Sequence, residues 1–142
     1  MKKVILVLTV LALSLTMNAQ SSSSKTLVSW LMGTQKIVEF NGGEHYSFIF
    51  QNAKYTITDI ESVSIGDKEG LIKFTNLIDS LMNKVVLEKG ESQSYSINDG
   101  RLSLTKSLGV NTLTIWSEHD LGYTGLSKFH VKKLRKVLAK LE

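Results

Sequence analysis

The chain has 142 residues, of which 42% are hydrophobic and 21% are charged, and its formal net charge at pH 7 is +4. It contains no cysteine, which excludes disulfide bridges and a lipid-modified N-terminal cysteine. The part that follows the N-terminal leader has about 120 residues, enough for one domain whose hydrophobic core supplies the stability.

The first residues have the pattern of a secretory signal peptide. Met1-Lys2-Lys3 is positively charged, an apolar run from Val4 to Leu15 follows, and Ala19 is a small residue suited to a signal peptidase. The alternative is an uncleaved anchor, but the run is shorter than the roughly 20 residues that a membrane span needs. We therefore expect a signal peptide over 1–19, export to the periplasm or medium after cleavage near Ala19, and no transmembrane segment in the mature chain.

A flexible leader with a short apolar segment is expected over 20–33. Leu27–Met32 is one helical turn or an edge strand, and periodicity does not decide at this length. The run Trp-Leu-Met-Gly-Thr over 30–34 resembles the opening of lipocalin-like domains, with Gln35 at the position of that family's tryptophan. The resemblance implies a continuous barrel that carries a small apolar ligand, and we keep it as an alternative.

Alternating apolar residues then predict a meander of three strands, over Gln35–Phe40, Glu44–Gln51 and Lys54–Ile60. Asn41-Gly42-Gly43 suits a tight turn, and a second turn at Asn52-Ala53 places Phe50 opposite Tyr55 and Phe48 opposite Ile57. Ser62–Ile65 extends the third strand.

An amphipathic helix follows over Gly70–Met82, with Asp67 as its expected N-cap. At about 100° per residue, its apolar residues fall on one face. These residues are Leu71, Phe74, Leu77, Ile78, Leu81, Met82 and Val85. Such a helix needs a sheet to cover.

The second half repeats this plan. A strand is expected over Gln93–Asn98, and Asp99-Gly100 predicts a hairpin in which Ile97 faces Leu102 and Tyr95 faces Leu104. A turn at Leu108-Gly109 then pairs Leu104 with Leu113 and Leu102 with Ile115. We expect a loop over Ser117–Thr124 and a second helix over Gly125–Leu141.

Together these elements predict an α+β fold of two pseudo-repeated antiparallel βββα units. The expected domain covers 34–142, with units over about 34–84 and 85–142, one sheet of six to eight strands and both helices packed on one face. Gly70-Leu71-Ile72-Lys73-Phe74 returns as Gly125-Leu126-Ser127-Lys128-Phe129. This order of elements resembles the doubled domains of the PUR and whirly nucleic-acid binders. The resemblance concerns fold only, and an exported protein is not expected to bind nucleic acid.

The second helix carries the charge pattern that suggests a partner. Its basic residues gather on one arc, with Lys133 at the border: Lys128, Lys132, Arg135, Lys136 and Lys140. Such a stripe attracts anions such as an envelope polymer or lipid head groups. The alternative is an ordinary solvated face, because no aromatic residues lie between the charges as nucleic-acid stacking would require.

Catalytic and metal-binding signatures are sparse. Glu118-His119-Asp120 is the only cluster of titratable groups and defines the alternative of a small hydrolase or metal site, whereas His45 and His130 suit structural roles. No nucleophile elbow or phosphate-binding glycine loop is present. The sequence thus favours a non-catalytic binding or envelope accessory domain without cofactor or metal.

Overall fold

The computed structural model of the protein describes residues 23–53, 59–118 and 122–142. The first half contains the strands β1 (Ser24–Trp30), β2 (Gln35–Phe40), β3 (His45–Gln51) and β4 (Ile60–Gly66), a 3-10 turn η1 (Leu31–Gly33), and the helix α2 (Lys68–Asn83). The second half contains β5 (Ser92–Ile97), β6 (Gly100–Ser107), β7 (Val110–Ser117), β8 (Tyr123–Leu126) and the helix α3 (Lys128–Leu141). The predicted signal peptide over 1–19 lies outside the described residues.

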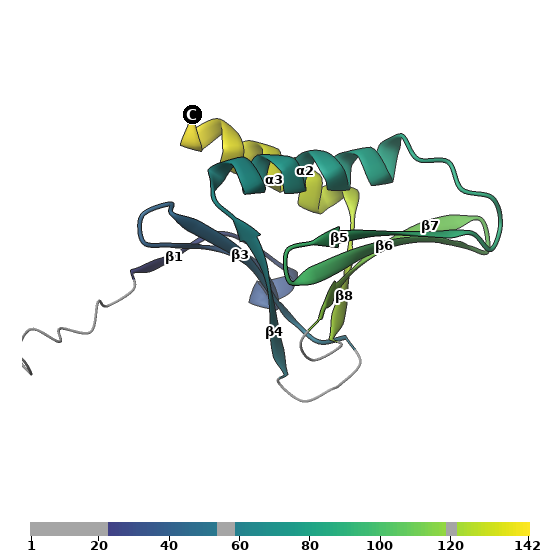
Figure 1. The fold of residues 1–142 in the computed structure, drawn as a ribbon, viewed down its shortest axis with the longest axis horizontal. Coiled ribbons are helices and arrows are strands. Elements are labelled where there is room, and N and C mark those ends of the chain that lie inside the picture. The colour runs from purple at the N-terminus through teal and green to yellow at the C-terminus, as the bar shows by residue number, and fades with distance from the viewer. Residues whose placement is uncertain (1–22, 54–58, 119–121) are drawn as a thin grey trace, which may run out of the picture.

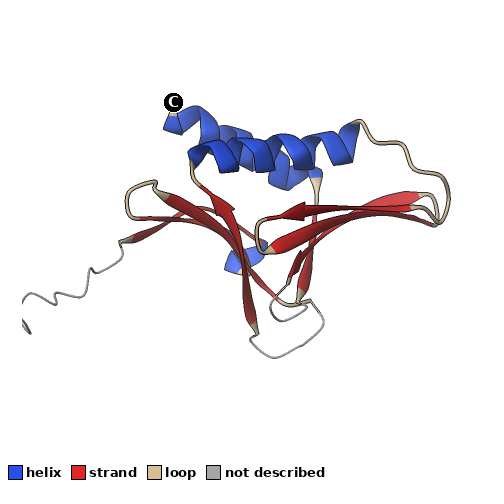
Figure 2. Ribbon diagram, viewed as in Figure 1, coloured by secondary structure: helices blue, strands red, loops and turns tan. Residues whose placement is uncertain are grey.

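The described strands form two antiparallel sheets of four strands each. Strands β1 to β4 make the first sheet and β5 to β8 the second, each in chain order. Figure 1 shows the two sheets inclined to each other, with α2 and α3 lying together across the same side of both, and Figure 2 shows the same layers. The predicted α+β class is confirmed. The predicted single sheet is wrong, because the described strands form two sheets. These strands do not close into the continuous barrel that the lipocalin-like alternative implies.

The two sheets are kept apart by side chains at the edge of β4. The backbone N–H of Ser64 donates to Asp99 Oδ1 over 2.6 Å, and the Ser64 carbonyl accepts from Asn98 Nδ2 over 2.9 Å. The β5–β6 loop thus occupies edge groups that a further strand would need for pairing. At the same crossing, a Cβ on Gly100 would lie 2.7 Å from Val63 Cγ1, so glycine allows the close approach.

The first sheet settles two predictions. Leu27–Met32 is divided between edge strand β1, which ends at Trp30, and η1. The predicted pairing of the third strand is wrong, because β3 pairs with β4, which begins at Ile60, and Phe48 lies opposite Val63 rather than Ile57. Val63 lies on the core side of that strand, whereas residues 54–58, including the predicted partners Tyr55 and Ile57, lie outside the described residues.

The second sheet confirms one hairpin and corrects the other. Leu104 pairs with Leu113 as predicted. In the first hairpin Tyr95 lies opposite Leu102, which differs from the predicted register by two positions. The reason is that Asn98 and Asp99 form the loop, with Asn98 at φ +38°, while Gly100 opens β6 where it passes Val63.

The strand β8 replaces the N-terminal part of the predicted second helix. Gly125 and Leu126 belong to β8, Ser127 is the N-cap, and α3 begins at Lys128. Gly70 and Leu71, by contrast, lie inside α2. The start of the repeated sequence therefore lies on a helix in the first half and on a strand in the second, and only its last two residues are helical in both.

Both helices pack their apolar faces onto one shared core. Asp67 caps α2 as predicted, since its Oδ1 accepts from the N–H of Gly70 over 2.9 Å. The core joins residues of both sheets and both helices, including Phe48, Leu81 and Leu134. No helix in the described ranges is long and apolar enough to cross a membrane.

Candidate functional site

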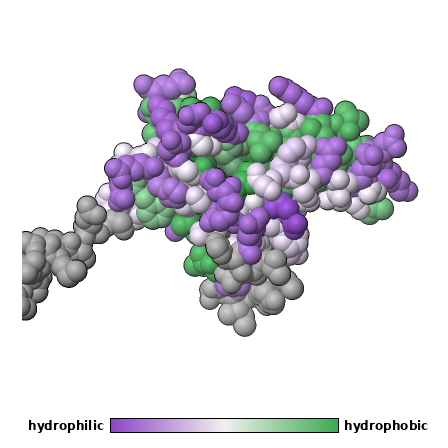
Figure 3. Space-filling view, in the orientation of Figure 1, coloured by the Kyte–Doolittle hydropathy of each residue, from purple (hydrophilic) through white to green (hydrophobic). Residues whose placement is uncertain are grey.

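Helix α3 has a buried side and a basic side. His130, Val131 and Leu134 are buried against the sheets. The five basic residues predicted to bind anions, at 128, 132, 135, 136 and 140, are all exposed, and no acidic residue interrupts Lys128–Leu141. Figure 3 shows hydrophilic side chains gathered at the C-terminal end of the helical layer. The basic residues that were predicted to share one arc therefore lie on the exposed side of the helix.

His130 anchors α3 to the first sheet. Gln35 Nε2 donates to Thr124 Oγ1 over 2.6 Å, which leaves Gln35 Oε1 to accept from His130 Nε2 over 2.5 Å. On the other side of the imidazole, Nδ1 accepts from the backbone N–H of Ser127 over 3.0 Å. This is the neutral tautomer with both ring nitrogens satisfied. Burial lowers the pKa of His130 to about 4, and the nearby charge of Lys133 acts in the same direction.

A basic groove runs between α3 and the edge strand β1. The β1–β2 register shifts between Thr26 and Val28, which leaves Leu27 as the extra residue of a bulge. The groove has a volume of about 390 Å³. Four lysines and four apolar residues are among those that line it: Lys25, Lys133, Lys136, Lys140, Leu27, Val28, Val137 and Leu141.

The lysines of the groove differ in how they are held. Lys133 Nζ donates to the Ser29 carbonyl over 3.0 Å and lies 4.9 Å from the centre of the Phe129 ring, so it ties α3 to β1. Within the described residues, Lys25, Lys136 and Lys140 make no ion pair. Three of the four ammonium groups are therefore available to a ligand.

The remaining predicted anion-binding residues lie away from the groove. Arg135 forms an ion pair with Asp79 of α2, and this contact lowers the pKa of the Asp79 carboxyl. Lys128 lies at the first turn of α3 beside a different cavity, and Lys132 is exposed and lines neither this cavity nor the groove. The structure thus brings Lys136 and Lys140 together and separates them from Lys128.

Sequence reasoning missed Lys25 as a member of the site. This lysine is more than a hundred positions from α3, and its place depends on β1 being the edge strand next to that helix. The signal that could have found it is the cationic, partly apolar composition of Lys25–Val28 on an edge strand.

The alternative hydrolase or metal site falls mostly outside the described residues. His119 and Asp120 are not described, and Glu118 is exposed, with its N–H donating to the Asp99 carbonyl over 3.1 Å. His45 is half-buried, and its Nε2 lies 3.3 Å from the hydroxyls of both Ser47 and Ser64. No cluster of metal-binding side chains occurs within 23–53, 59–118 and 122–142.

The sequence matches no protein-family model and no curated protein.

Proposed function

We propose that this protein is an exported, non-catalytic binding domain that holds an anionic ligand of the cell envelope in the groove between β1 and α3. Export is supported by the signal-peptide pattern of 1–19, with cleavage near Ala19 and delivery to the periplasm or medium. The ligand class is supported by the charge of the groove.

The observation that carries the proposal is the combination of free lysines with an apolar floor. Lys136 and Lys140 rise from α3 over the half-buried side chains of Leu27 and Val137. Glu39 lies opposite Lys25 in the β1–β2 ladder and offsets part of its charge, so the two helix lysines provide most of the attraction. A fully hydrated polymer has no apolar groups that could cover the apolar floor of the groove, so its binding would gain no hydrophobic stabilisation. We therefore favour lipid head groups over an anionic envelope polymer.

The test compares binding to vesicles that contain phosphatidylglycerol with binding to vesicles of phosphatidylcholine alone. Each lysine near an anionic surface contributes about 1 kcal/mol, so replacing both Lys136 and Lys140 by Gln is expected to weaken binding about thirtyfold. The matched control replaces Lys84 and Lys89, two exposed lysines outside the groove, by Gln in the same way. It should leave binding to the phosphatidylglycerol vesicles nearly unchanged.

Two further measurements complete this test: the dependence of vesicle binding on salt concentration, and binding to soluble polyphosphate. Binding of the unaltered protein should fall steeply as salt rises. If soluble polyphosphate binds and the vesicles do not, the ligand is a polymer. Equal losses in the groove variant and the control, or no binding to either anion, would contradict the proposal.

The internal duplication belongs to the same proposal. Its support is the order of elements, in which four strands and a helix occur twice. The repeated sequence at Gly70 and Gly125 gives no support, because the first copy lies wholly within α2, whereas the second copy begins on β8 and enters α3 only at Lys128.

A further inference from the structure

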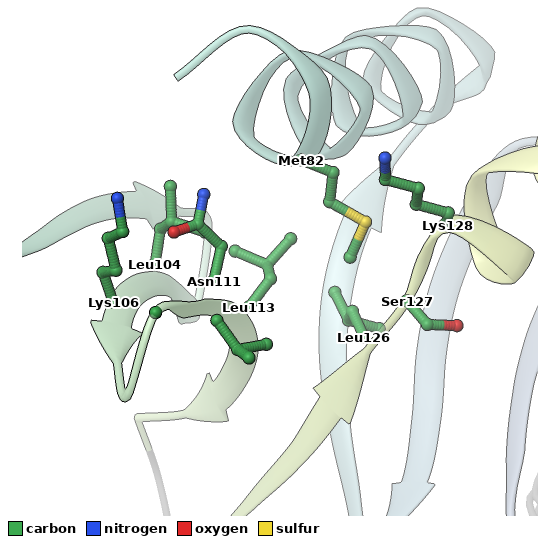
Figure 4. A pocket seen from close by; sticks show the side chains of 10 residues that line it. Met82, Leu104, Lys106, Asn111, Leu113, Leu126, Ser127 and Lys128 are labelled. Atoms are coloured by element: carbon green, nitrogen blue, oxygen red, sulfur yellow. The ribbon is translucent and has the colours of Figure 1, made fainter. Parts of the chain in front are cut away.

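A second cavity lies at the opposite end of α3, where the C-terminal part of α2, the β6–β7 hairpin and the start of α3 meet. Its volume is about 550 Å³, within the range of roughly 300 to 1,000 Å³ that is usual for small-molecule sites. Figure 4 shows side chains from these three elements around one space. The groove of the proposed function has none of these residues in its lining.

The floor of this cavity is apolar. Leu104, Leu113 and Leu126 come from three neighbouring strands and are buried in the core. Met82 reaches down from α2 between them and the start of α3 (Figure 4). A methionine side chain is flexible and adapts to the shape of a bound apolar group. The floor therefore suits a hydrocarbon chain.

The rim of this cavity is cationic. Lys106 and Lys128 stand on opposite sides of it in Figure 4, and no acidic residue is among the residues that line it. Lys106 Nζ donates to the Leu87 carbonyl over 2.7 Å. Lys128 makes no ion pair within the described chain, so its charge is available to a ligand.

We propose that this cavity binds a medium-chain carboxylate. The hydrocarbon chain lies against Leu104, Leu113 and Leu126 beside Met82, and the carboxylate meets the ammonium group of Lys128 at the rim. The inference is independent of the proposed function, because it involves another site that shares no lining residue with the groove.

The experiment measures binding of octanoate, decanoate and decanol to the full chain by calorimetry. Each methylene buried in the cavity should strengthen binding by about two- to fourfold, so decanoate is expected to bind more tightly than octanoate. Replacing Lys128 by Met should weaken decanoate about tenfold and leave decanol unchanged, since a charge-assisted contact contributes about 1.5 kcal/mol or more. Lys36→Met, on the outer face of the first sheet, is the control with the same loss of charge and should not alter decanoate binding.

A second variant tests the location without altering the core. Val110 lines the mouth of the cavity and is 64% exposed, so Val110→Glu should fold normally and repel the carboxylate. Weaker decanoate binding with unchanged decanol binding supports the site. Equal effects of Lys128→Met and Lys36→Met, chain-length-independent binding, or no binding of decanoate would overturn it.

Discussion

Gln35 and His130 show how single residues join the two halves of the molecule. Both are buried, and the amide of Gln35 is fully used, since Nε2 also donates to the Gly125 carbonyl over 3.1 Å. The His130 ring stacks on Trp30, with ring centres 4.8 Å apart. The sequence indicated a structural role for His130. It did not identify Gln35 as the partner, because a buried glutamine cannot be told from an exposed one by spacing alone.

The burial of His130 predicts a loss of stability in acid. Its pKa is about 4 in the folded chain and near 6.5 in the unfolded chain, so the unfolded state binds the proton more readily. The contribution of His130 to the free energy of unfolding is therefore fully present above pH 6.5. It is lost as the pH falls toward 4, and the total loss is about 3 kcal/mol. Urea unfolding over this pH range measures the effect.

The matched variant is His130→Gln, which keeps a polar side chain but does not titrate. It should be less stable at neutral pH and should show a smaller loss of stability between pH 6.5 and 4 than the unaltered protein. If the free energy of unfolding falls equally with pH in both proteins, groups other than His130 cause the acid sensitivity.

At the scale of elements, the sequence was most informative where apolar and polar residues followed a regular strand or helix period. It placed β2, β3 and most of α2 correctly, and it gave the register of the β6–β7 hairpin. It missed β8, which has only four residues and includes Thr124 and Gly125. It also shifted the β5–β6 hairpin by two positions, because Gly100 suggested a turn residue. The close packing of Gly100 against Val63 depends on a contact between sheets, which local patterns do not contain.

That contact gives a prediction about Gly100→Ala. A Cβ at this position would lie 2.7 Å from Val63 Cγ1 and 2.8 Å from the Trp116 carbonyl, so a side chain and a strand backbone would have to move. Such overpacking is expected to lower the free energy of unfolding by about 1 to 3 kcal/mol. Chemical denaturation measures the change.

The control for this prediction is Gly125→Ala. A Cβ on Gly125 meets nothing within 4 Å, and the residue has no positive φ, so the variant should be nearly as stable as the unaltered protein. If Gly100→Ala is as stable as Gly125→Ala, the two sheets do not pack at this crossing as described.

At the scale of the whole molecule, the groove is a product of the arrangement of the two sheets and two helices. Lys133 and Ser29, which join its two walls, are 104 positions apart. The sequence predicted the basic arc of α3 but not the strand that faces it. It also treated the five basic residues as one surface, whereas the fold separates them. Arg135 pairs with Asp79, Lys128 lines the cavity beside Met82, Lys136 and Lys140 line the groove, and Lys132 is exposed and lines neither.

The central claim is that anionic ligands bind between β1 and α3. The most direct measurement is NMR mapping of backbone amides during titration with short-chain phosphatidylglycerol below its micelle concentration. The claim predicts that the largest shifts occur at 25–28 and 133–141, and that they disappear when Lys136 and Lys140 are both replaced by Gln. Shifts of equal size along the whole of α3, or shifts centred on the outer faces of the sheets, would contradict it.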